Sequence, residues 1–133
     1  MNVAEDKAKE FIAGNHRAVM ATIRSDGMAQ MSNVAQAFLD GHIEVSTRSA
    51  SAKVRNLRRD PRVTMLILGD ESWYQYAVVY GRVQIVEYPE AAERLRKIYR
   101  TIAGEHPNWA EFDQAMVDEG RVVLRVEIDR IVS

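Results

Sequence analysis

The spacing of apolar residues changes near residue 15, and the change predicts a helix followed by strands. Residues 3–13 have apolar side chains three and four positions apart, which predicts a helix. Asn2 and Glu5 resemble a capping box at its start, and Gly14 ends it. Beyond this point the apolar period falls to two through Ile23, which predicts a first strand.

Further strands follow, separated by turn residues. Asp26-Gly27 is a hairpin signal, so the first three strands are predicted to form a short-range antiparallel meander. Gly81 lies inside the longest strand and predicts a bulge or a sharp bend there. The strands after the first are predicted at residues 28–39, 42–47, 62–68, 73–87 and 121–132.

Three more helices are predicted among these strands. Residues 50–59 have helical spacing, and Asp60 ends that helix because it precedes a proline. Pro89 opens the next helix, and Asn108 caps the last one. About six antiparallel strands with four helices at the edges predict a mainly β fold, a closed or nearly closed barrel with flanking helices. Residues 1–133 contain no repeat or linker, which predicts a single domain.

The composition excludes several classes of chemistry. The chain has no cysteine, which removes disulfides, thiolate metal sites and thiol nucleophiles. Its three histidines have no metal-type spacing, and no nucleophile motif, P-loop or dinucleotide fingerprint is present. If the protein is an enzyme, a bound cofactor is therefore expected to carry the reaction. With no signal peptide and no apolar run of membrane-spanning length, a cytoplasmic protein is expected.

The net charge of -1 conceals a strongly basic segment. Residues 48–62 contain six basic side chains and one acid, a net of +5, so the other 118 residues sum to -6. Small and hydroxyl-bearing residues precede the helix predicted within this segment. Hydroxyls, free backbone N–H groups and nearby cations form a good phosphate cradle. The alternative is a solvated helix face that balances acidic neighbours.

Two other segments are candidates for ligand contact. Asn33 is a polar residue within a predicted strand, where it could contact a cofactor ring or could simply mark an edge or a bulge. An aromatic cluster lies at the start of the predicted strand 73–87, and alternation places its tyrosines on one face. Such rings stack on ligands or, more commonly, pack in cores and subunit interfaces. The cluster consists of Trp73, Tyr74, Tyr76 and Tyr80.

Several segments resemble one known family, in order and nearly end to end. The most specific are KVRNLRRDPR at residues 53–62 and IAGEH at residues 102–106, with further matches at residues 21–27, 30–34 and 121–124. The chain resembles the split-barrel flavin/deazaflavin oxidoreductases, the superfamily that includes pyridoxamine 5′-phosphate oxidase. Within it, the chain is most similar to the actinobacterial F420-binding group. This resemblance implies a six-stranded antiparallel split barrel that forms a homodimer with cofactor sites at the subunit interface.

The resemblance also implies which residues bind the cofactor. The cofactor phosphate would lie at Ser46, Thr47, Lys53 and Arg55, with Ala50, Ser51 and Ala52 on the approach to it. Ser51 stands where some relatives have an arginine, for which Arg48 is a possible substitute. The ring would lie along Met31, Ser32, Asn33 and Val34, and Trp73 and Tyr76 would come from the partner subunit.

The function implied is an F420H2-dependent reductase that transfers a hydride from the deazaflavin to an enone, a quinone or a similar conjugated compound. The accompanying proton would come from solvent or from Tyr76. The alternatives are an FMN-binding oxidase or flavoprotein and a non-catalytic F420 carrier. Pyridoxine chemistry is disfavoured because further substrate-phosphate arginines are not found. Nucleic-acid binding by residues 48–62 is disfavoured because the rest of the chain is acidic.

Overall fold

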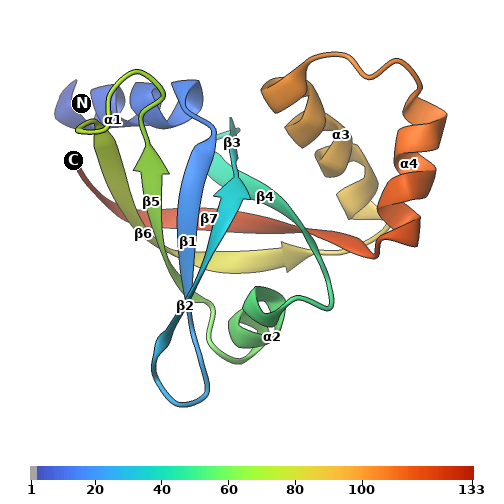
Figure 1. The fold of residues 1–133 in the computed structure, drawn as a ribbon, viewed down its shortest axis with the longest axis horizontal. Coiled ribbons are helices and arrows are strands. Elements are labelled where there is room, and N and C mark those ends of the chain that lie inside the picture. Colours follow the sequence, from blue (N-terminus) through green and yellow to red (C-terminus); the bar gives the residue numbers. More distant parts are fainter. Residues whose placement is uncertain (1–2) are drawn as a thin grey trace.

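In the computed structural model, which describes residues 3–133, one curled antiparallel sheet is flanked by helices (Figure 1). The capping box predicted at Asn2 lies outside the described residues. The elements are α1 (Val3–Gly14), β1 (Arg17–Ile23), β2 (Ala29–Ala35), β3 (Ala37–Leu39), β4 (His42–Arg48), α2 (Ala52–Arg59), β5 (Arg62–Leu68), β6 (Tyr76–Val86), α3 (Glu90–Ala103), α4 (Trp109–Asp118) and β7 (Arg121–Val132).

The sheet contains seven strands from the described part of the chain, in the order β2-β1-β5-β6-β7-β4-β3. Every neighbouring pair is antiparallel. The two edge strands, β2 and β3, are consecutive in the chain. The sheet therefore curls until its edges are joined covalently at one corner, which agrees with the predicted, nearly closed barrel.

The single strand predicted at residues 28–39 is wrong, because the chain turns the barrel corner at Gln36. The Gln36 side chain is fully buried, and its Nε2 donates to the carbonyl oxygens of Ile12 at 2.7 Å and Asn15 at 2.6 Å. These bonds hold the corner against the end of α1. Both short-range antiparallel pairings of the predicted meander are present, β1 with β2 and β3 with β4, but β2 and β3 are separate strands at opposite edges of the sheet.

Two apolar clusters form the core. The larger fills the barrel, and its fully buried side chains include Met20, Ile43, Met65, Ile67 and Leu124. The smaller lies on the other side of the sheet, where α3 and α4 pack over β7. Its buried members include Leu95, Ile98, Phe112 and Val123. Both faces of the first half of β7 are therefore covered, which explains why apolar residues occur there at odd and even positions.

The bulge predicted at Gly81 is confirmed. The β6–β7 register shifts between Tyr80 and Gly81. A Cβ atom on Gly81 would lie 2.3 Å from the carbonyl oxygen of Glu127, so the two backbones approach too closely for any side chain at this position.

The strand predicted at residues 73–87 begins later, at Tyr76. The preceding residues form a turn. In it the Gly69 N–H donates to the Gln75 carbonyl at 2.9 Å, and the Gln75 N–H donates to the Ser72 carbonyl at 3.2 Å. Strand alternation therefore does not apply to Trp73 and Tyr74, which are placed by the turn.

The predicted helix ends agree closely with the structure. The Asn108 side chain accepts a hydrogen bond from the Glu111 N–H at 3.1 Å and caps α4. Pro89 is the residue before α3 rather than its first residue. Within residues 3–133, no helix is both long and apolar enough to cross a membrane.

Candidate functional site

The β4–α2 connection carries a buried hydroxyl that has no partner. Ser51 stands at the N-cap of α2 and its N–H donates to the Arg48 carbonyl at 3.1 Å, but its side chain makes no capping hydrogen bond. The Ser51 Oγ is shielded from solvent and bonds to no described atom. Arg55 reaches back to the same turn, where its Nη1 donates to the Ala50 carbonyl at 2.6 Å. An unsatisfied buried hydroxyl costs about 1–3 kcal/mol, so a ligand oxygen here would be stabilising.

Positive charge gathers around this turn. Arg48 and Arg121 face each other across the β4–β7 ladder, and both contact the Glu119 carboxylate, at 3.5 and 2.8 Å. The hydrogen bond from Arg121 lowers the pKa of Glu119. Partial burial, and then the charge of Arg121, lower the pKa of the Lys53 ammonium, which makes no ion pair with any described residue. With Lys53 and Arg55 included, four cations lie around this turn, and Glu119 pairs with two of them.

An anionic group with acceptor oxygens fits this arrangement. It would offset the repulsion between Lys53 and Arg121, and it would accept a hydrogen bond from the buried Ser51 hydroxyl. The arrangement lies at the start of an eight-residue helix, where backbone N–H groups also favour negative charge. By contrast, the described residues contain no cluster of three or more acidic or histidine side chains suited to a metal ion.

A buried hydrogen-bond network joins α2 to β2 through β1. Asn56 Nδ2 donates to Thr22 Oγ1 at 3.1 Å, and Thr22 Oγ1 donates to Gln30 Oε1 at 3.3 Å. Thr22 is fully buried and Asn56 nearly so. Arg59 adds a bond from its Nη2 to the Ile23 carbonyl at 2.7 Å. Sequence reasoning missed Thr22 and Gln30, although a polar residue on the buried face of an alternating strand was an available signal.

The β2 segment presents two kinds of side chain. Met31 and Asn33 are exposed, whereas Val34 packs against the barrel core. The Ser32 Oγ is buried and bonds to no described atom, like that of Ser51. In the described sheet β2 pairs with β1 alone, so one edge of its backbone remains open to a ligand.

The structure does not bring Trp73 and Tyr76 to this site within one chain. The turn that holds Trp73 and leads into β6 at Tyr76 lies beside the start of β1, where Arg17 Nε donates to the Asp70 carboxylate at 3.0 Å (Figure 1). The helix α2 contacts the opposite end of β1, through the bond from Arg59 to Ile23. Trp73 is 84% exposed and lines an open apolar hollow of about 310 Å³ on the surface of β5 and β6.

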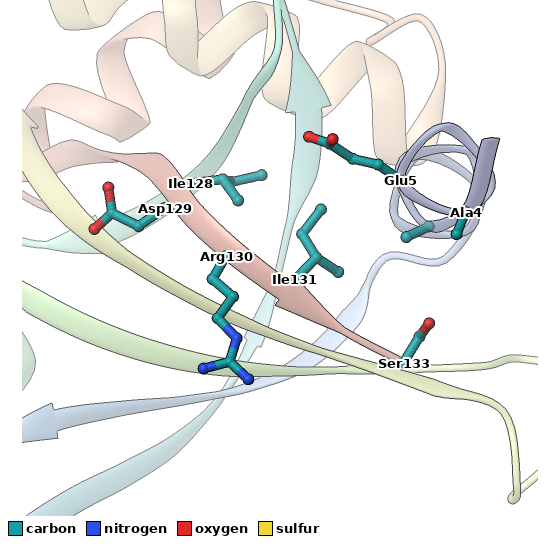
Figure 2. A pocket seen from close by; sticks show the side chains of 8 residues that line it. Ala4, Glu5, Ile128, Asp129, Arg130, Ile131 and Ser133 are labelled. Atoms are coloured by element: carbon teal, nitrogen blue, oxygen red, sulfur yellow. The ribbon is translucent and has the colours of Figure 1, made fainter. Parts of the chain in front are cut away.

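Another hollow, of about 280 Å³, lies between α1 and the end of β7. Figure 2 shows that Glu5 extends over Ile128 and Ile131, whereas Arg130 points to the other side of β7. The charged groups do not converge on one point, and none of the residues predicted to bind the cofactor lines this hollow. It is therefore not the candidate site.

The curled antiparallel sheet with its edge strands joined at one corner defines the split-barrel class. A family model described as pyridoxamine 5′-phosphate oxidase matches residues 4–133, so the chain belongs to that family. This membership confirms the predicted fold and superfamily.

Solved structures agree with this assignment. A conserved hypothetical protein from Mycobacterium tuberculosis is 29% identical, with a TM-score of 0.80 over 98% of this chain and 82% of its own. An F420 reductase is 22% identical, with a TM-score of 0.74 over 93% of this chain and 94% of its own. A heme binding protein from Mycobacterium smegmatis is 18% identical, with a TM-score of 0.77 over 98% of this chain and 53% of its own. The last two likenesses concern the fold alone.

Proposed function

We propose that the protein is an F420H2-dependent reductase that acts on conjugated small molecules such as enones or quinones. The observation that carries the proposal is the turn before α2, where an unpartnered buried hydroxyl lies among four cations and one carboxylate. When bound, the deazaflavin would supply a transferable hydride, which accounts for the lack of a nucleophile or acid/base pair in the sequence.

In this proposal the chain holds the cofactor at two places. The phosphate is bound where charge and hydroxyls converge, and the ring lies along the open edge of β2. Because the Asn56–Thr22–Gln30 network links these places, their spacing is fixed before the cofactor binds. The proposed phosphate-side residues are Ser46, Thr47, Arg48, Ala50, Ser51, Ala52, Lys53 and Arg55, and the ring-side residues are Met31, Ser32, Asn33 and Val34.

The choice of F420 over FMN rests on the sequence resemblance to the F420-binding group, and the likeness of fold to an F420 reductase agrees with it. The phosphate cradle itself does not discriminate, because FMN and F420 both present a phosphate to the protein. Binding of each cofactor must therefore be measured separately.

We further propose that the active unit is a homodimer in which Trp73 and Tyr76 approach the cofactor bound by the other copy. Support comes from their exposure and from their position at the end of β1 remote from α2. Tyr76 would then present its hydroxyl as one source of the proton that completes the reduction, with solvent as the other.

The test compares two variants that each remove one positive charge from α2. Lys53→Gln should weaken F420 binding by about 10- to 100-fold, since a hydrogen bond to a charged group contributes about 1.5–3 kcal/mol. Arg58→Gln, the control, should bind normally, because Arg58 pairs with Glu87 at the other end of the helix. Fluorescence titration with F420, and in parallel with FMN, gives the dissociation constants.

Lys53→Gln should retain the wild-type melting temperature, because burial and Arg121 already disfavour the charged ammonium. Unchanged F420 affinity in Lys53→Gln would refute the phosphate site. Tight FMN binding without F420 binding would show that the cofactor is FMN and not F420. F420 binding with no oxidation of the reduced cofactor across a panel of enones and quinones would indicate a carrier.

A further inference from the structure

A cavity of about 330 Å³ lies between the α3–α4 pair and the sheet. Its walls are mainly apolar and include Ile98, Tyr99, Ile102, Phe112 and Met116. This volume falls within the range of about 300–1,000 Å³ that is usual for small-molecule sites. The cavity is separate from the hollows beside Trp73 and beside α1.

The aromatic wall of this cavity is held rigidly. The Tyr99 ring packs edge-on against Phe112 at 5.2 Å and Trp109 at 5.9 Å between ring centres. The guanidinium groups of Arg96 and Arg100 lie over Trp109, at 5.3 and 4.9 Å from its ring centre. Such interlocking contacts favour a preformed wall against which a flat ring can stack.

The sheet side of the cavity is partly polar and carries a positive charge. Ser46 of β4 and Arg121 of β7 line it, and Arg121 faces Arg48 across the β4–β7 ladder. Glu119 fixes the Arg121 guanidinium through bonds to Nε at 3.1 Å and Nη2 at 2.8 Å. The cavity thus combines mainly apolar walls with one cationic side chain, a combination that complements an amphipathic anion.

The cavity also adjoins both segments proposed to bind the cofactor. Ala35, the last residue of β2, lines it directly after the proposed ring-side residues. Ser46, which is itself a proposed phosphate-side residue, lines it from β4. A molecule in the cavity would therefore lie next to a ring bound along β2.

We propose that this cavity binds a flat, conjugated organic anion, with its ring system against Tyr99 and Phe112 and its carboxylate at Arg121. The role of this anion as the substrate rests on the proposed function. Binding of such an anion to the cavity does not rest on it, and is tested on the protein without cofactor.

The probe is 2-naphthoate, compared by isothermal titration calorimetry with 2-naphthol, which has the same rings but no carboxylate.

Ala103 is an exposed residue on the cavity wall, so Ala103→Trp should fill the space without disturbing the core. We expect it to weaken 2-naphthoate binding by about tenfold or more. The matched control is Ala110→Trp, an exposed helical alanine that does not line the cavity, and it should bind like wild type. Arg121→Gln should remove the preference for 2-naphthoate over 2-naphthol.

Wild-type affinity in Ala103→Trp, or an unchanged preference in Arg121→Gln, would overturn the proposal. A further titration uses protein saturated with F420. Retained binding of 2-naphthoate supports a separate site beside the cofactor, whereas displacement by F420 overturns it. If F420 does not bind, the proposed function fails while the result for the cavity still stands.

Discussion

At the scale of single residues, Gly81 carries the sharpest steric requirement. A Cβ atom here would meet backbone, the Glu127 carbonyl oxygen at 2.3 Å, which cannot rotate away as a side chain could. Gly81→Ala should therefore lower the free energy of unfolding by about 1–3 kcal/mol, the usual cost of overpacking. Urea denaturation monitored by circular dichroism measures this change.

The control for this prediction is Gly14→Ala. A Cβ on Gly14, the last residue of α1, meets no atom within 4 Å, so this variant should be as stable as wild type or slightly more stable. Equal stability of Gly81→Ala and Gly14→Ala would contradict the close approach of β6 and β7 at the bulge.

Residue chemistry could be predicted from the sequence only where one residue type has few uses. Gly81 indicated a bulge because glycine inside a strand is costly without one, and the bulge is confirmed. The anion site indicated by the cations of residues 48–62 stays a prediction. The partners of Gln36 and Thr22 could not be predicted. Gln36 bonds to Ile12, 24 positions away, and Thr22 bonds to Asn56, 34 positions away, so nothing near either residue in the sequence reveals these partners.

At the scale of elements, α3 is fixed to the sheet by a nearly buried ion pair. The Arg94 guanidinium donates to both carboxylate oxygens of Glu44, whose side chain is only 1% exposed. Removing Glu44 leaves the largely buried Arg94 guanidinium with only the exposed Asp40 carboxylate as a partner, so Glu44→Ala should lower the free energy of unfolding by about 3–5 kcal/mol. Thermal and urea denaturation would detect this loss.

Asp40 provides the matched comparison, because its exposed carboxylate contacts the same arginine at 3.3 Å. Asp40→Asn should cost less than about 1 kcal/mol, as exposed ion pairs usually do. Similar losses of unfolding free energy in Glu44→Ala and Asp40→Asn would show that burial of the ion pair does not determine its contribution to stability.

Most elements could be predicted because their patterns are local. The strands β5 and β7 begin and end at the predicted residues, and α2 begins two residues late and ends as predicted. The errors fall where tertiary structure overrides the pattern. Residues 28–39 read as one strand because Gln36 fits the alternation, yet its buried bonds to the end of α1 turn the chain there. Residues 73–75 are rich in strand-forming aromatics but are held in a turn.

At the scale of the whole molecule, the turn before α2 with its cations and the exposed side chains of Trp73 and Tyr76 lie at opposite ends of β1. The sequence places them only 18 positions apart, counted from Arg55 to Trp73, and cannot show that β5 carries the chain from one end of the barrel to the other. If both groups serve one cofactor site, two copies of the chain must supply them. The proposed dimer follows from this separation.

Mixing two defective variants tests this arrangement. In a mixed dimer of Lys53→Gln and Trp73→Ala, one site carries both changes and the other carries neither. Random reassociation of equal amounts makes half of the dimers mixed, so about a quarter of all sites should regain tight F420 binding. Equilibrium dialysis counts the restored sites, at an F420 concentration that fills wild-type sites and leaves those of each variant largely empty.

A mixture of Lys53→Gln with Arg55→Gln is the control. Each site of a mixed dimer then carries one of the two changes, so no site is restored. Recovery in neither mixture would mean that Lys53 and Trp73 do not meet across a subunit interface.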